Sequence, residues 1–351
     1  MTTTPPTADT TGTHSTTRAR ADADGGSDGG PSGTTPSAPI EHADAIQDVT
    51  GALGSAQTWQ PSPHEWLPQR LLTALAQHRM ATTAQLHAML RPEVTRQTIS
   101  TPLNRLRDKG FVDFVVLPRS QRTRAWYLTT DGVRFTRDHP ALRGRPPYPI
   151  TSATAASLKT PHTLTVVRTH LAFAADARER GDEHGPLDWT PEVCHPIGEN
   201  TRLTADAVLH YTLTSTGQRT KLRAFIEVDR STMSSERLAA KLIDYARLWS
   251  YEPQPVGRQH ARKPAGSSPL WLRWYPVFPR VLFVLTGAPR HRLEHRISDL
   301  KAMTAQHPHV AALGRYVPLA AALLDDLEHH RPTGDVWVPL AGGEPRPWTD
   351  L

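Results

Sequence analysis

The chain of 351 residues is 38% hydrophobic and 21% charged, so it can bury a sizeable core and hold two ordinary domains. Its single cysteine, Cys194, excludes an internal disulfide framework and a cysteine-rich zinc site. The net charge is +6, and because no secretory signal or bilayer-length apolar stretch is visible, we expect a cytoplasmic protein without a membrane partner.

Charge is distributed unevenly along the first half of the chain. Residues 1–60 contain seven acidic residues and two arginines, are rich in Thr, Ser, Gly and Pro, and show no apolar periodicity, which predicts a disordered acidic tail. Residues 61–149 contain fourteen lysines and arginines against six acidic residues. Such a basic block favours a polyanionic partner, because protein cations that neutralise phosphates release the counterions of nucleic acid.

Three helices are predicted at the start of this basic block. The first has leucines at helical spacing from Leu67 to Leu75, and the second is capped by Thr82 or Thr83. The third stops at Gly110, since glycine is favoured just past the end of a helix. The inward positions of the third helix are Ile99, Leu103 and Leu106.

Two extended runs, residues 111–117 and 124–128, follow the helices and predict a β-hairpin wing. The segments Leu106-Arg-Asp-Lys-Gly-Phe-Val112 and Trp126-Tyr-Leu-Thr-Thr-Asp-Gly132 resemble the pattern of winged-helix transcription regulators. The resemblance implies that the third helix enters the major groove of double-stranded DNA and that the wing touches its phosphates.

The same resemblance assigns the side chains that face DNA. On the third helix they are Arg96, Gln97, Ser100, Asn104 and Arg105, and on the wing they are Arg119, Arg122 and Arg124. Arginine, glutamine and asparagine can read base edges, and arginine also binds phosphate. Pro102 lies inside the third helix, which is therefore expected either to kink there or to start late, near Thr98 to Thr101. The alternative is a winged helix that serves as a protein–protein module.

A linker at residues 141–160 is predicted to separate the DNA-binding domain, residues 61–140, from a second domain at residues 161–345. The expected elements of the second domain are a helix at 162–180, strands at 189–195, 202–213 and 221–229, a helix at 235–249 and a strand at 281–285. This α-β-β-β-α-β order resembles the core of PD-(D/E)XK nucleases and predicts an α/β (α+β) fold class. A further helix is predicted from Leu319 to His330.

Three acidic residues of the second domain occupy the positions that the nuclease resemblance requires. Asp206 lies on the second strand, and Glu227 and Asp229 lie two residues apart on the third strand, so that both point to one side. Carboxylate oxygens suit Mg²⁺, which would polarise a phosphodiester and help to generate the attacking hydroxide. These residues are therefore the candidate catalytic and metal-binding residues.

The sequence departs from the nuclease pattern at its signature lysine, whose place is taken by Asp229. Lys241, on the following helix, is the candidate replacement for this catalytic lysine. The alternative is that Glu227, Asp229 and Arg230 form a partly buried ion-pair network in a fold without catalytic activity. No G-x-x-x-x-G-K-[ST] loop is present, so nucleotide hydrolysis is not predicted.

The winged helix together with the block Ala224-Phe-Ile-Glu-Val-Asp-Arg-Ser-Thr232 and Leu238-Ala-Ala-Lys-Leu-Ile-Asp-Tyr245 resembles the replication-relaxation family of actinobacterial plasmids and mobile elements. The resemblance implies a DNA-associated role in plasmid or mobile-element replication or transfer. Together with the nuclease-like core, it predicts a DNA-binding protein that has a metal-dependent nickase or nuclease activity as one reading and no small-molecule substrate. The alternative is a non-catalytic regulator or adaptor whose second domain mediates homodimerisation or partner binding.

Overall fold

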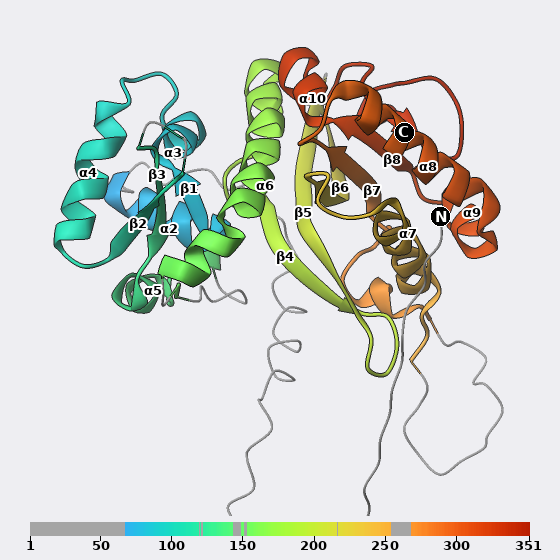
Figure 1. Ribbon diagram of the computed structural model, residues 1–351, viewed down its shortest axis with the longest axis horizontal. Coiled ribbons are helices and arrows are strands. Elements are labelled where there is room, and N and C mark those ends of the chain that lie inside the picture. Colours follow the sequence, from blue (N-terminus) through green and yellow to red (C-terminus); the bar gives the residue numbers. More distant parts are fainter. Residues whose placement is uncertain are drawn as a thin grey trace, which may run out of the picture. The chain divides into compact units, whose positions relative to one another are not determined.

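The structure is a computed structural model that describes residues 67–118, 120, 122–142, 149–150, 153–215, 217–253 and 268–351 (Figure 1). The expected acidic tail and Arg119 of the expected wing lie outside these residues.

The first part of the described chain, residues 67–142, corresponds to the predicted winged helix and is therefore called the winged-helix segment. Its elements are α2 (Leu67–His78), β1 (Met80–Thr82), α3 (Thr83–Leu90), α4 (Gln97–Asp108), β2 (Val112–Val116), β3 (Arg124–Leu128) and α5 (Thr130–Thr136), followed by a 3-10 turn at Pro140–Leu142. The three strands form an antiparallel sheet in the order β1-β3-β2. Three helices followed by a β-hairpin are the element order that the sequence predicted.

The ends of the helices in this segment follow from local chemistry. The Thr82 side chain accepts a hydrogen bond from the Gln85 backbone N–H, and the Gln85 side chain accepts one from the Thr82 N–H, which forms a capping box at α3. Helix α4 begins at Gln97 and continues through Pro102, so the late start is not observed. After α4, Gly110 has a φ of 79°, a left-handed conformation that glycine adopts without steric strain.

The second part of the chain is built on a six-stranded mixed sheet. Its elements are α6 (Ala153–Arg180), β4 (Trp189–Pro196), β5 (Arg202–Ser215), β6 (Gln218–Asp229), α7 (Ser235–Ser250), β7 (Arg280–Leu285), α8 (Arg290–Gln306), α9 (Pro308–Gly314), β8 (Leu319–Leu323), α10 (Leu324–His330) and β9 (Val338–Pro339), with 3-10 turns at Leu270–Arg273 and Trp348–Asp350. The strand order is β4-β5-β6-β7-β8-β9. Strands β6, β7 and β8 are parallel, and the other neighbours are antiparallel.

This arrangement confirms the mixed α/β class and the α-β-β-β-α-β order, with two differences. Helix α6 begins at Ala153 rather than at His162, and it includes Pro161. The segment Leu319–Leu323 is a strand, so the helix expected from Leu319 begins only at Leu324. Leucine and alanine favour helices in isolation, but all five residues of β8 are buried between β7 and β9, and tertiary packing overrides that preference.

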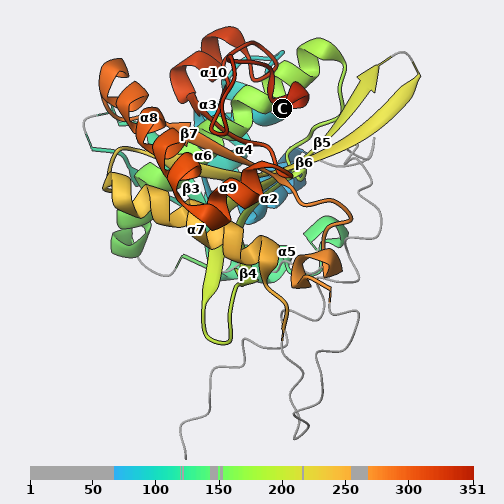
Figure 2. The same ribbon diagram turned by 90° about the vertical axis from the view of Figure 1, so that its right-hand side faces the viewer.

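Helices cover both faces of the large sheet (Figure 2). Helices α7, α8 and α9 pack on one face through residues such as Leu242, Ile297 and Val310. Helices α6 and α10 pack on the opposite face through Phe173 and Leu327. Apolar side chains on both faces of the sheet are therefore buried beneath helices, as expected for strands that are buried on both sides.

Helix α6 also belongs to the core of the winged-helix segment. Val167 is 1% exposed and packs among the residues of that core, which α2, α3 and α4 supply. Polar contacts accompany this packing. The Gln85 side chain donates to the Leu164 carbonyl of α6 at 2.8 Å, and the Gln77 side chain donates to the Trp189 carbonyl of the neighbouring β4 at 2.7 Å. One helix therefore contributes to two cores.

Several histidines are buried as neutral rings. The His170 ring lies 4.8 Å from the His78 ring and 5.1 Å from the His184 ring, measured between centroids. On β4, the Nε2 atom of His195 lies 2.9 Å from the Tyr275 hydroxyl. Burial lowers the pKa of His184 and of His195 to about 4, so both side chains are uncharged at neutral pH.

Candidate functional site

The outer face of α4 is polar because the apolar positions of the helix point into the core. Ile99 and Leu103 are fully buried, and Leu106 is nearly so. Four of the five side chains predicted to read DNA are exposed and the fifth, Ser100, is half-buried; the exposed four are Arg96, Gln97, Asn104 and Arg105. The helix therefore presents guanidinium and amide groups together on one accessible surface.

The wing residues differ in their positions. Arg122 is exposed in the turn between β2 and β3, where its φ is 65°. Arg124 lies on β3 and donates from Nη1 to the Asn104 Oδ1 atom of α4 at 3.0 Å. Its guanidinium carbon also lies 4.4 Å from the centre of the Phe114 ring on β2. Arg124 thus joins the base of the wing to α4, whereas Arg122 lies in the wing turn.

A break in the regular pattern of β5 positions Asp206. Ala205 packs in the core beneath α7, but Ala207 packs in the core on the opposite face of the sheet, so the alternation of side chains slips by one residue between them. The pairing registers with β4 and β6 both omit Asp206. Opposite it on β4, Glu192 has a φ of 54°. The β4–β5 register is the same on both sides of this break, so no residue is inserted, and the Asp206 carboxylate lies beside β6.

The contacts of Asp206 extend to two other elements. Its Oδ2 atom accepts a hydrogen bond from the Val228 backbone N–H on β6 at 2.7 Å. Its Oδ1 atom lies 3.1 Å from Nε2 of His162 on α6, and this hydrogen bond raises the pKa of His162. The half-buried Asp206 carboxylate therefore connects α6 with the centre of the sheet.

Glu227 is held between two side chains of α7. Its Oε1 atom accepts a hydrogen bond from the Tyr245 hydroxyl at 2.7 Å, and its Oε2 atom lies 2.9 Å from Nζ of Lys241. Burial raises the pKa of Glu227 to about 7, with a further increase from the negative charge of Asp206, while Lys241 and Tyr245 lower it. The structure thus brings Asp206, Glu227 and Lys241 together. They are called here the carboxylate site.

Asp229 points to the same face of the sheet but has a different partner. It is 1% exposed, and its Oδ2 atom lies 2.6 Å from Nη2 of Arg296 on α8. The cations that pair with the two buried carboxylates of β6 are therefore Lys241 and Arg296, and not Arg230, which the alternative ion-pair network included.

Three residues of this region were not predicted from the sequence: His162, Tyr245 and Arg296. Tyr245 follows Lys241 by four residues on a predicted helix, so helical periodicity would have placed both side chains on one face. His162 and Arg296 lie far from the carboxylates in sequence, and no local pattern links them to the strands.

The carboxylate site contains two neighbouring carboxylates, Asp206 and Glu227, and both oxygens of Glu227 have partners on α7. Among the residues that the structure describes, no three His, Cys, Asp or Glu side chains are arranged to hold a metal ion. Asp206 and Glu227 are close enough for the charge of one to raise the pKa of the other, whereas Asp229 is paired with Arg296. Two neighbouring carboxylates are a suitable oxygen donor set for Mg²⁺.

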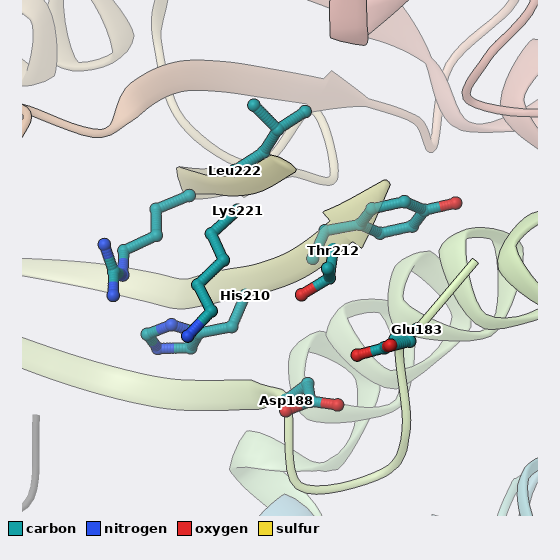
Figure 3. A pocket seen from close by; sticks show the side chains of 8 residues that line it. Glu183, Asp188, His210, Thr212, Lys221 and Leu222 are labelled. Atoms are coloured by element: carbon teal, nitrogen blue, oxygen red, sulfur yellow. The ribbon is translucent and has the colours of Figure 1, made fainter. Parts of the chain in front are cut away.

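A small pocket lies elsewhere, on the β5–β6 hairpin (Figure 3). Its lining includes Glu183, Asp188, His210 and Lys221, and none of its lining residues belongs to the carboxylate site. Burial raises the pKa of Asp188 to about 6. The pocket is therefore a separate feature of the sheet rather than an opening to Asp206 and Glu227.

These elements define a mixed α/β protein in which three helices and a β-hairpin precede a six-stranded mixed sheet that carries two neighbouring carboxylates. The family model described as replication-relaxation matches residues 72–258, more than half of the chain. The chain therefore belongs to the replication-relaxation family, as the sequence predicted, and this membership connects it with DNA and with plasmid replication or relaxation. No curated protein and no solved structure matches the chain. Within the part of the chain that the structure describes, no helix has the length and apolarity needed to cross a membrane.

Proposed function

We propose that the chain binds double-stranded DNA during the replication or transfer of a plasmid or mobile element, with α4 in the major groove. The exposed face of α4 carries this proposal. Gln97, Asn104 and Arg105 project from a helix whose opposite side is fixed in a core, and the exposed Arg96 lies at its N-terminal cap. Side chains of these types donate to guanine and adenine edges in the major groove, and arginines also neutralise phosphates.

Salt dependence tests this proposal on the full chain. Affinity for a labelled duplex, followed by fluorescence anisotropy, should fall linearly with salt on a double-logarithmic plot. The triple variant Arg96→Ala, Arg105→Ala and Arg122→Ala should bind every duplex more weakly, with the slope reduced by roughly 1 for each phosphate that is no longer neutralised. Arg134→Ala is the matched control, since Arg134 is an exposed arginine on α5 that already pairs with Asp131.

Two outcomes would contradict DNA binding through α4. One is an affinity that does not change with salt, and the other is a triple variant that binds as the control does. Either result would favour the alternative in which the winged-helix segment contacts a protein partner.

We further propose that the carboxylate site gives the chain a metal-dependent phosphodiesterase activity. The observation that favours it is the meeting of Asp206, Glu227 and Lys241, although the lysine comes from α7 instead of the strand. Asp206 and Glu227 would hold Mg²⁺, which supplies polarisation of the phosphodiester and a more acidic bound water. Lys241 supplies a positive charge that stabilises the negative charge developing on the phosphate.

Supercoiled plasmid distinguishes this activity from a non-catalytic adaptor. Wild type should nick the plasmid with Mg²⁺ but not with a chelator, and Mg²⁺ should raise its unfolding temperature by mass action. Glu227→Gln keeps the shape of the side chain but should lose both effects while it retains salt-dependent DNA binding. Glu199→Gln, at an exposed position outside the site, should behave as wild type.

The adaptor alternative predicts a different result in the same assays. If the buried carboxylates serve only the fold, wild type shows neither nicking nor stabilisation by metal. In that case the pairs of Glu227 with Lys241 and of Asp229 with Arg296 are structural. Equal nicking by wild type and Glu227→Gln would identify a contaminating nuclease.

A further inference from the structure

We propose that Asn104 and Arg124 act as one reading unit that selects guanine in the major groove, with Arg124 as the residue that positions Asn104. This inference rests on the proposed DNA binding by α4. It goes beyond that proposal, because it assigns a base preference to one position and gives Arg124 a role in specificity rather than in phosphate contact alone.

Arg124 is anchored from several sides. Its guanidinium carbon lies 4.4 Å from the centre of the Phe114 ring and 5.8 Å from that of Trp126. Arg107, from the end of α4, lies 4.8 Å from the same Phe114 ring, so two guanidinium groups contact one aromatic side chain. A planar guanidinium that rests on an aromatic face loses much of its rotational freedom.

The backbone around Phe114 is also fixed. Phe114 pairs with Trp126 across β2 and β3, and the two rings meet edge to face at 5.0 Å. The Asp113 carboxylate accepts hydrogen bonds from the Phe114 N–H at 2.9 Å and from Nε of Arg107 at 3.3 Å. The platform beneath Arg124 therefore connects the hairpin to the carboxyl end of α4.

The hydrogen bond from Arg124 determines which way the Asn104 amide faces. A guanidinium group only donates, so the atom that it meets at 3.0 Å must be the amide oxygen. The Asn104 NH₂ group then points away from Arg124. Because both side chains are exposed, the pair offers the remaining N–H donors of the amide and of the guanidinium to the groove.

A surface whose free groups are mainly donors discriminates between bases. Guanine presents two acceptors in the major groove, N7 and O6, whereas adenine presents one acceptor and one donor. Asparagine reads adenine by accepting and donating at once, and here the accepting oxygen would have to serve the base and Arg124 together. The geometry therefore favours guanine at the base pair that Asn104 faces.

The test uses the full chain and a duplex library with randomised positions. Wild type should select sites with guanine at one position, and a change of that base pair should weaken binding by roughly 5- to 150-fold. Asn104→Ala and Arg124→Ala should each remove the preference at this same position. The double variant should lose no more than either single variant, because the two side chains act as a unit.

Two conservative variants separate positioning from charge or folding. Asn104→Asp still accepts from Arg124 but has no N–H donor, so the guanine preference should disappear. Arg124→Lys keeps the charge, and with it the salt dependence, but lacks the planar fork, so the preference should also weaken. Arg134→Ala should leave the preference intact.

Selection of adenine at this position would overturn the inference, and so would a preference that survives in Arg124→Ala. Additive losses in the double variant would show that the two residues read DNA independently. These outcomes are distinct from failure of the proposed function, in which wild type itself shows no salt-dependent binding to any duplex.

Discussion

Lowering the pH from about 7.5 to about 5 should remove free energy of unfolding through the buried histidines. Burial holds the pKa of His184 and of His195 at about 4 in the folded chain, against 6.5 as the ordinary value. The unfolded chain therefore takes up protons below about pH 6.5, whereas the folded chain does not until about pH 4. The contribution of each histidine to the free energy of unfolding is fully present above about pH 6.5 and is lost as the pH falls towards about 4. At about pH 5 the loss is about 2 kcal/mol for each histidine.

Two buried carboxyl groups act in the opposite direction. Their pKa values are raised in the folded chain, to about 7 for Glu227 and about 6 for Asp188, in both cases chiefly through burial. The folded chain keeps these protons at pH values where the unfolded chain has released them, so acidification stabilises it, by about 2 and about 1 kcal/mol at about pH 5. The change in the free energy of unfolding with pH is therefore the sum of a loss from the histidines and a gain from the carboxyl groups. A variant of one histidine is needed to measure its contribution separately.

His195→Phe provides that separation. The phenylalanine ring can keep the contacts with Phe225 and Trp274, whose centroids lie 5.3 and 5.4 Å from that of His195, but it cannot be protonated. Loss of the hydrogen bond to Tyr275 lowers stability by an amount that does not depend on pH in this range. The free energy difference between wild type and variant, from urea denaturation, should decrease by about 2 kcal/mol between about pH 7.5 and about pH 5.

The control for this experiment is His291→Phe, because His291 is exposed on α8. Its difference from wild type should change far less over the same range. A difference between wild type and His195→Phe that stays constant with pH would refute the argument that His195 is buried as a neutral ring.

Two further substitutions test the packing. Gly132→Ala would place a Cβ atom 2.0 Å from the Phe111 carbonyl oxygen and should lower stability by about 1–3 kcal/mol, whereas Gly198→Ala, whose nearest neighbour lies at 3.6 Å, should have little effect on the thermal midpoint. Equal midpoints for these two variants would contradict the close packing of α5 on the start of the hairpin. Arg296→Met would leave the buried Asp229 carboxylate without its cation and should cost about 3–5 kcal/mol in urea denaturation. Addition of Asp229→Asn should restore most of that loss, and a double variant as unstable as the single one would show that the ion pair is not the cause.

The winged-helix segment was predictable because its signals are local. Thr82 before a short apolar helix and Gly110 after the next one fix element ends through contacts within a few residues. The polar positions of α4 follow from the spacing of its buried residues alone. What the sequence could not show is the hydrogen bond between Asn104 and Arg124, which depends on how the hairpin returns to the helix.

The sheet shows where local preference is insufficient. The segment Leu319–Leu323 has a composition that suits a helix, and only its place between β7 and β9 makes it a strand. Lys241 lies 2.9 Å from Glu227, on the helix where the sequence placed it. The partner of Asp229 could not be assigned from the sequence, because it lies on α8, which begins about sixty residues later in the chain. The roles of these residues in catalysis remain predictions.

Because α6 contributes to two cores, the winged-helix segment cannot be separated from the sheet without exposing part of a core. A DNA-binding segment that completes its core by itself can be exchanged between proteins as an independent cassette. Here the winged-helix segment depends on Val167 and on the Leu164 carbonyl, both from a helix that also supports the sheet. A cut after residue 150 would leave apolar surface bare on both fragments. We therefore expect residues 67–351 to fold as one cooperative unit and to be exchanged between proteins as one piece.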